Sequence, residues 1–403
     1  MTGAALARAA ADFRRGFPML EHVVHLSSCS LGARSTALDA ALDRMLSAMM
    51  AGGGAWHDFE SEVAGARARF AALIGADPEQ VAVVPSASVG AYQAVSTIGM
   101  HRRDGVVTTA DEFPSLAHVW LAQRPRGARV VFADGGPPPL RSGPDRQAPP
   151  DAARHLVADY AAVVDERTAL VSVPLVTYAG GVLQPVAEIA RHAHAQGARV
   201  LVDAYQAVGV LPVDVDELGC DYLVAGALKY LLGLPGIAFL YARAGAPDDV
   251  DPSLTGWFGR TDPFAFDPRR LDFPVGARRF ETGTVSVPSV YAANAGLDLI
   301  AGLDLGEVRR HVTGLIELAA GRLAADGETV RMRADAAAHG AHVGLAVDDP
   351  PALTGWLADR GIAVSPRGPL VRLSFHYYND ESDVERLCAA VREFRSRRQV
   401  RSR

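Results

Sequence analysis

Two neighbouring stretches, RVLVDAYQAVG (residues 199–209) and DYLVAGALKYLLGLPGIAFLYA (residues 221–242), decide the fold of this 403-residue chain. Each contains a short apolar run, which Asp203 follows in the first stretch and Lys229 follows in the second. Short apolar runs bounded by helical segments are typical of parallel strands that are covered on both faces. Ligands of such sheets bind outside the carboxyl ends of the strands, so we expect Asp203 and Lys229 to contribute to one site.

The same alternation extends along much of the chain. Further runs are VAVVP (81–85), GVVTT (105–109), ARVVFA (128–133), ALVSVPLV (169–176) and IAFLYA (237–242). They predict βαβ units of an α/β fold, with a mostly parallel central sheet and helices on both faces. Helices are expected at 35–50 and 58–73, separated by Gly52–Gly54, and the segment Gly135–Pro150, rich in proline and glycine, is expected to be a loop.

After about residue 292 the pattern changes. A long helix (about 287–325), two weak strands (VRMRA, 330–334, and AHVGLAV, 341–347), a helix (351–360), the strand LVRLSF (370–375) and a last helix (381–397) predict a smaller α+β domain. We therefore expect an N-terminal segment at 1–50 near the active site, a large domain at 51–290 and a small C-terminal domain at 291–403.

Composition excludes several classes of protein. Hydrophobic residues make up 49% of the chain and the formal net charge is −6, which gives no reason to expect nucleic acid or an anionic membrane as partner. No apolar run has the length of a transmembrane helix, and the first residues lack the apolar core of a signal peptide. The 3 cysteines are too few and too scattered for a disulfide framework or a zinc site. We expect a cytoplasmic protein without a metal.

Lysine is nearly absent. Of 40 lysine and arginine residues only Lys229 is lysine, which leaves 39 arginines. Where arginine replaces lysine so widely, a retained lysine points to chemistry that needs a primary amine, because a guanidinium stays protonated and forms imines poorly. Lys229 is therefore a candidate for Schiff-base formation. The alternative is chance survival at the surface.

The residues around the two central runs suit one cofactor, pyridoxal 5′-phosphate (PLP). Asp203 can pair with a protonated pyridine nitrogen, which makes the ring an electron sink. Gln206 is placed to reach the ring's phenolic oxygen, and Phe113, held by the proline after it, can stack on the ring. Ser86 and Ser88 flank the start of a helix whose free N–H groups suit a phosphate. Each has a plainer alternative: a helix cap for the aspartate and the serines, and a core aromatic for Phe113.

With HLSSCSLG (25–32), VTYAGGV (176–182), LTGWFGR (254–260), RRFETGT (278–284) and VRLSFHYYN (371–379), these motifs resemble the fold-type I PLP enzymes of the class V aminotransferase superfamily. The likeness spans about residues 20–395 and is greatest to the kynureninase and isopenicillin-N-epimerase-like branch. It implies a homodimer with shared active sites, in which Lys229 forms the internal aldimine and Asp203 pairs with the ring nitrogen. The other cofactor-binding positions it implies are Ala87, Ser88, Phe113, Tyr178 and Gln206, with Trp257 and Thr284 reaching the phosphate of the partner subunit.

The same resemblance places the substrate on Arg372, Ser28 and Cys29. Arg372 also makes physical sense, because a guanidinium clamps a carboxylate through two hydrogen bonds and Arg372 is the polar member of an alternating strand. For Cys29 the alternative is a buried small hydrophobe.

Several positions depart from the family's subgroups. The stretch GIAVSPRGPLVRLSF (361–375) has no cysteine, which argues against cysteine desulfurase or selenocysteine lyase chemistry. Kynureninases have tyrosine before the lysine, where this chain has Leu228, and they differ at Ser115, Leu116 and Arg260, which argues against a true kynureninase.

The sequence thus predicts a PLP enzyme that acts on an amino acid with an α-carboxylate through an external aldimine and a Cα carbanion. Transamination is favoured as the default of the superfamily, with a place in specialised metabolism by analogy. The alternatives are a kynureninase-like or C–S β-lyase, an epimerase, and a non-enzymatic binding or regulatory protein that keeps the fold.

Overall fold

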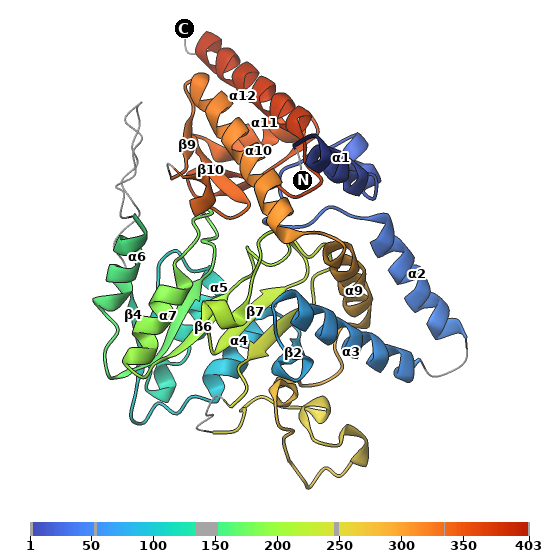
Figure 1. Cartoon of the computed structure of the whole chain (residues 1–403), viewed down its shortest axis with the longest axis vertical. Helices are drawn as coiled ribbons and strands as arrows, with labels where there is room; N and C mark the ends of the chain where they lie inside the picture. The colour runs from blue at the N-terminus through green and yellow to red at the C-terminus, as the bar shows by residue number, and fades with distance from the viewer. Residues whose placement is uncertain (1–2, 52–54, 134–151, 246–249, 334, 402–403) are drawn as a thin grey trace.

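The computed structural model describes residues 3–51, 55–133, 152–245, 250–333 and 335–401. Its centre is a seven-stranded sheet of order β2-β8-β7-β6-β5-β3-β4 (Figure 1). The strands are β2 (Val81–Val84), β3 (Gly105–Thr108), β4 (Arg129–Phe132), β5 (Thr168–Pro174), β6 (Arg199–Asp203), β7 (Tyr222–Gly226) and β8 (Ala238–Ala242). All run in one direction except β8, which is antiparallel to both neighbours. The predicted α/β fold with a mostly parallel sheet is confirmed.

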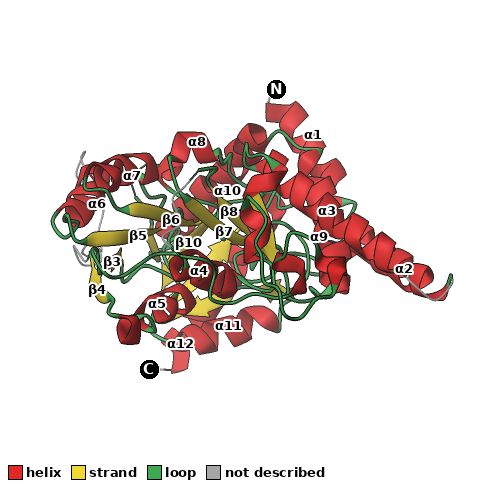
Figure 2. Ribbon diagram, turned by 90° about the horizontal axis from the view of Figure 1, so that it is seen from below, coloured by secondary structure: helices red, strands yellow, loops and turns green. Residues whose placement is uncertain are grey.

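Each strand sends alternate side chains into two separate cores, as the period of a strand requires. Val200 and Val202 of β6 face the core that includes α3 (Trp56–Leu73), α6 (Ala152–Ala161) and α7 (Val186–Ala195), whereas Leu201 faces α4 (Ala87–Ser96) and α5 (Pro114–Leu121). Figure 2 shows the strands enclosed between these helices. Coverage of both faces explains why the strands read as continuous apolar runs.

Two local expectations were wrong. The run that forms β8 is antiparallel to β7, because the two strands are joined by a loop without a crossover helix, and only a crossover returns the chain for parallel pairing. The expected single helix at 287–325 is two helices, α9 (Val287–Ala301) and α10 (Leu305–Ala325). Gly302 caps the first, and the Asp304 side chain caps the second by accepting a hydrogen bond from the Glu307 N–H.

A second, antiparallel sheet lies above the first in Figure 1. Its order is β12-β13-β10-β9, from β9 (Thr329–Arg331), β10 (His342–Ala346), β12 (Ser365–Arg367) and β13 (Leu370–Ser374). With it lie α10, α11 (Pro350–Ala358) and α12 (Glu381–Arg401), which runs beyond its expected end at 397. The proposed domain division at residue 290 falls within α9 and stays a prediction. Gly52–Gly54 and the expected loop Gly135–Pro150 lie outside the described residues.

The N-terminal segment connects the two sheets. After α1 (Gly3–Arg14), the strand β1 (Val24–His25) pairs in parallel with β11 (Ile362–Ala363), and the chain then passes the β7–β8 loop before α2 (Thr36–Met50). There the Gly32 N–H donates to the Leu228 carbonyl at 2.8 Å. In the part of the chain that the structure describes, no helix is both long enough and apolar enough to cross a membrane.

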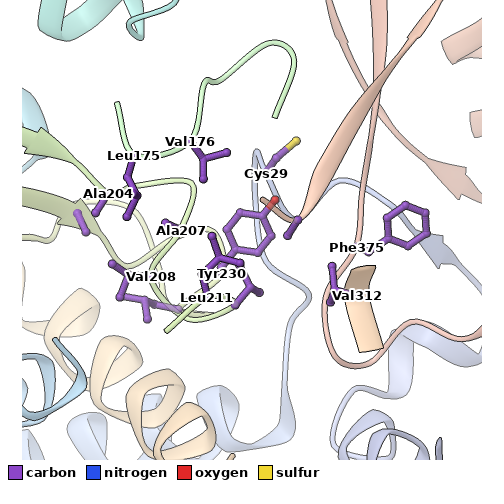
Figure 3. Packing of buried hydrophobic residues seen from close by; sticks show 14 of the residues in the cluster. Cys29, Leu175, Val176, Ala204, Ala207, Val208, Leu211, Tyr230, Val312 and Phe375 are labelled. Carbon is purple, nitrogen blue, oxygen red and sulfur yellow. The ribbon is translucent and has the colours of Figure 1, made fainter. Parts of the chain in front are cut away.

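The β7–β8 loop, which carries Lys229, is held by close backbone packing. A Cβ on Gly32 would lie 2.4 Å from the Lys229 carbonyl oxygen, and one on Gly296 of α9 would lie 1.9 Å from the Leu231 carbonyl oxygen. In Figure 3 the Tyr230 ring beside them packs among apolar side chains of the segment that follows β6. The loop therefore has no room to shift, which fixes the position of Lys229.

We predict that Gly296→Ala destabilises the protein by about 1–3 kcal/mol, because the new methyl group must displace backbone atoms of the lysine loop. Gly314→Ala is the matched control. Gly314 lies exposed in α10 with nothing within 4 Å of its added Cβ, so alanine should stabilise by about 0.5–1 kcal/mol through helix propensity. Urea unfolding followed by circular dichroism measures both, and equal effects of the two substitutions would contradict the packing of this loop.

Candidate active site

A cavity of about 360 Å³ opens where the carboxyl ends of the parallel strands meet the β12–β13 hairpin. This is the position expected for a ligand of an open α/β sheet. Most of the predicted site residues lie on its wall, which includes Cys29, Ser30, Ser86, Ala87, Ser88, Phe113, Tyr178, Asp203, Tyr205, Gln206, Leu228, Lys229, Arg367 and Arg372. Residues far apart in sequence, from 29 to 372, are thus brought together.

Lys229 projects its amine between two aromatic rings. Its Nζ lies 4.1 Å from the centroid of the Tyr205 ring and 5.4 Å from that of Phe113. The pKa of Lys229 is lowered to about 8, mainly by burial and to a smaller degree by the two arginines of the cavity, against the opposite effect of Asp203. A substantial share of this amine is therefore neutral near pH 8, as a nucleophile or a base must be.

Asp203 ends β6 and is buried, and its Oδ1 accepts a hydrogen bond of 2.9 Å from the Tyr205 N–H. Close enough to feel its charge lies a second buried carboxyl group, Glu112, which accepts hydrogen bonds from the Phe113 N–H at 2.9 Å and from the Ser172 hydroxyl at 2.8 Å. Burial, with the negative charge of Asp203 as the second cause, raises the pKa of Glu112 to about 8. Burial raises the pKa of Asp203 as well, whereas the Tyr205 N–H and Lys229 lower it, so Asp203 is the carboxyl group of this pair that a cation in the cavity would hold charged.

Sequence reasoning missed Glu112, although it lies beside Phe113 in the stretch DEFPS (111–115). The pattern of this stretch indicates only its neighbour Phe113, an aromatic residue that follows a strand. The signal that could have identified Glu112 is a charged residue just after a buried strand, but only the fold shows that it lies buried near Asp203 rather than at the surface.

Arg372 is held firmly on the opposite wall. Its Nη1 donates to the Tyr178 carbonyl at 2.8 Å and its Nη2 to the Ser30 hydroxyl at 2.7 Å, while its buried Nε has no partner among the described residues. The Tyr178 ring meets the Phe113 ring edge-on, with centroids 5.4 Å apart. An arginine that is 1% exposed, with a free N–H beside a cavity, is suited to bind a carboxylate.

The residues present fit PLP on three observations. Asp203 and Phe113 flank Lys229, as a pyridine ring linked to that amine requires. The buried Gln206 Oε1 has no hydrogen-bond partner among the described residues, which leaves a polar atom for a ligand. At the remaining end of the cavity, α4 begins at Ala87 with Ser86 as its cap, and the first N–H groups of a helix suit a phosphate.

Three predicted residues lie elsewhere. The Ser28 hydroxyl bonds to the Tyr378 hydroxyl at 2.6 Å, and Ser30 rather than Ser28 lies on the cavity wall. Trp257 and Thr284 do not line the cavity of the single chain, so their expected contact with the partner subunit's phosphate stays a prediction. Cys29 does line it, and its carbonyl accepts from Gln206 Nε2 at 3.1 Å.

Comparisons with known proteins agree with the resemblance seen in the sequence. A family model described as aminotransferase class-V matches residues 43–387. An uncharacterized aminotransferase of Bacillus subtilis is 33% identical over 93% of this chain and 95% of its own length. A kynureninase of Pseudomonas fluorescens is 29% identical, covering 91% and 87% respectively. The solved structure of a cysteine desulfurase from Thermococcus onnurineus has a TM-score of 0.81 at 23% identity, covering 95% of this chain and 97% of the other, which shows a shared fold.

The lowered pKa of Lys229 makes a prediction for the cofactor-free protein. Only the neutral amine attacks an aldehyde, so the rate of binding PLP should rise with pH through a midpoint near 8 and level off above it. Rapid-mixing absorbance measures this rate. Asp203→Asn should move the midpoint lower, because Asp203 raises the pKa of Lys229. A midpoint above about 10, the value of an ordinary lysine, would contradict the environment described for this amine.

Proposed function

Because this chain belongs to the aminotransferase class-V family, we propose that it is a PLP-dependent aminotransferase acting on amino acids that carry a free α-carboxylate. The observation that carries this proposal is the shared cavity of Lys229, Asp203 and Arg372, which supplies an amine, an anion and a carboxylate-binding cation. A binding or regulatory protein would not need a lysine amine whose pKa burial lowers to about 8.

Bound PLP supplies an electron-accepting ring that stabilises negative charge at the substrate's Cα. Lys229 would hold the cofactor, Asp203 would keep the proton on the ring nitrogen, and Phe113 would cover one face of the ring. The first N–H groups of α4 and the Ser88 hydroxyl would bind the phosphate. Glu112 supports this arrangement, because it accepts hydrogen bonds from the Ser172 hydroxyl and the Phe113 N–H and so holds the backbone of Phe113 in place.

With PLP bound, Lys229 would be the base available at the substrate's Cα. The described lining of the cavity contains no histidine and no glutamate, and the pKa of Lys229 is lowered by burial to about 8. With PLP bound, a lysine amine at this place would take up and release the proton that transamination moves at the substrate. The absence of a histidine or glutamate base from the described lining, together with the similarity to an aminotransferase, supports transamination over the alternatives.

A β-lyase of kynureninase or C–S type is the second candidate. It is supported by the likeness to kynureninases and by Tyr178, whose ring lies on the cavity wall where a phenol could protonate a leaving group. The absence of a cysteine at 361–375 and Leu228 before the lysine speak against desulfurase and true kynureninase chemistry.

We also propose that the active form is a homodimer. Trp257 lies 6.0 Å from Trp56, 5.7 Å from Phe264 and 6.1 Å from Phe266 between ring centroids. Phe266 is 70% exposed, which is unusual for a large aromatic unless another surface covers it. Because the family resemblance assigns Trp257 to the partner subunit's site, a second copy of this chain is the occupant we propose.

The three cysteines are buried and unpaired, which suits a reducing cytoplasm.

The dependence on an acceptor tests the proposed reaction. We expect the PLP-loaded enzyme to turn over an amino acid only when a 2-oxo acid is supplied, and to form the 2-oxo acid of the donor and the amino acid of the acceptor in equal amounts. Liquid chromatography with mass spectrometry measures both products across the common amino acids.

Lys229→Ala should abolish turnover together with the absorbance band at about 410–430 nm that lysine-bound PLP gives. Turnover without an acceptor, with release of pyruvate, alanine or sulfide, would replace the aminotransferase proposal with the lyase. A protein that gains no band after PLP is supplied would overturn both.

A further inference from the structure

The cavity wall carries a second arginine besides Arg372, on the same face of the same hairpin. β12 pairs antiparallel with β13, and Ser365 lies directly opposite Arg372. Side chains alternate along a strand, so Arg367, two residues after Ser365, projects from the same face as Ser365 and Arg372. Arg367 and Arg372 both line the cavity.

Neither guanidinium has a carboxylate partner. Within the described residues no ion pair involves Arg367 or Arg372, and the hydrogen bonds they donate go to neutral oxygens. For Arg367 the acceptor is the carbonyl of its own neighbour, Pro366, at 2.8 Å. By contrast, many of the described surface arginines pair with an aspartate or a glutamate, for example Arg310 with Glu307 at 3.2 Å.

Positive charge dominates the cavity as a result. Its described lining contains Lys229, Arg367 and Arg372 but only one carboxylate, Asp203, which lies at the carboxyl end of β6. The charges act on one another: burial lowers the pKa of Arg372, and Arg367 lowers that pKa further. Placing like charges together in a partly buried site costs free energy unless an anion enters.

Neither PLP nor the α-amino and α-carboxylate groups that all amino acids share would bind both arginines. The phosphate of PLP belongs at the first turn of α4, which follows β2 in the large sheet, whereas Arg367 lies on the hairpin of the small sheet. One α-carboxylate fills the free side of Arg372. The Ser30 hydroxyl, which lies 2.8 Å from the Ser365 hydroxyl, accepts a hydrogen bond of 2.7 Å from Arg372 Nη2 and so holds the guanidinium in place.

We propose that the substrate is an acidic amino acid, whose α-carboxylate binds Arg372 and whose side-chain carboxylate binds Arg367. This inference rests on the proposed function and narrows it to one substrate class. The half-exposed position of Arg367 suits a group that meets the outer end of a substrate.

Isosteric pairs of amino acids test the charge directly. We expect kcat/KM of the wild-type enzyme to be at least ~10-fold higher for glutamate than for glutamine, or for aspartate than for asparagine, because the guanidinium of Arg367 forms a charge-assisted pair with the acid and not with the amide. Arg367→Gln should bring the ratio close to one. The control Arg310→Gln, at an exposed position of α10, should leave it unchanged. Equal turnover of the acid and the amide by the wild-type enzyme would overturn the inference. This comparison does not depend on whether any variant folds.

A binding measurement gives a readout apart from turnover. Titration calorimetry of the PLP-loaded protein should show tighter binding of glutarate or succinate than of butyrate, and Arg367→Gln should remove the difference while the cofactor's absorbance band persists. A persistent band with no preference for dicarboxylates would refute the acidic substrate but leave the PLP enzyme standing. Loss of the band in the wild type would instead refute the proposed function.

Discussion

The site depends on the confinement of the loop between β7 and β8. Because β8 returns antiparallel to β7 without a crossover helix, the loop must turn within the space between the sheet, α9 and the N-terminal segment. Gly32 and Gly296 let neighbouring backbones approach its carbonyl groups more closely than any side chain would permit. The amine of Lys229 is thereby held at the carboxyl edge of the sheet, in a buried position where its pKa falls to about 8.

The surrounding charges are arranged around this amine by different parts of the fold. The carboxyl end of β6 supplies Asp203, and the loop that follows β3 supplies Glu112, whose raised pKa keeps a second negative charge out of the site. The hairpin of the small sheet supplies Arg367 and Arg372, which have no carboxylate partners among the described residues. One wall therefore favours a cationic ring and the other favours anions, which is the polarity that an amino-acid substrate joined to PLP would need.

The sequence predicted features that depend on local order, and it missed those that depend on packing between distant segments. Asp203, Phe113 and Lys229 could be placed because each follows an apolar run, and parallel strands bring such positions to one edge. The direction of β8 and the choice of Ser30 over Ser28 depend on long-range contacts that no local pattern records. Glu112 and Arg367 looked like ordinary charged residues, since only the fold shows that Glu112 is buried and that Arg367 has no carboxylate partner among the described residues.

Reduction with borohydride tests the central claim most directly, because it converts the bond between PLP and its amine into a stable product. Lys229 is the only lysine, so the amino terminus is the only competing primary amine in the chain. After reduction, proteolysis and mass spectrometry, the peptide that contains Lys229 should carry the phosphopyridoxyl group, and Lys229→Arg should carry none. An unmodified Lys229 peptide, or a label found only at the amino terminus, would contradict the assignment of Lys229 as the cofactor's lysine.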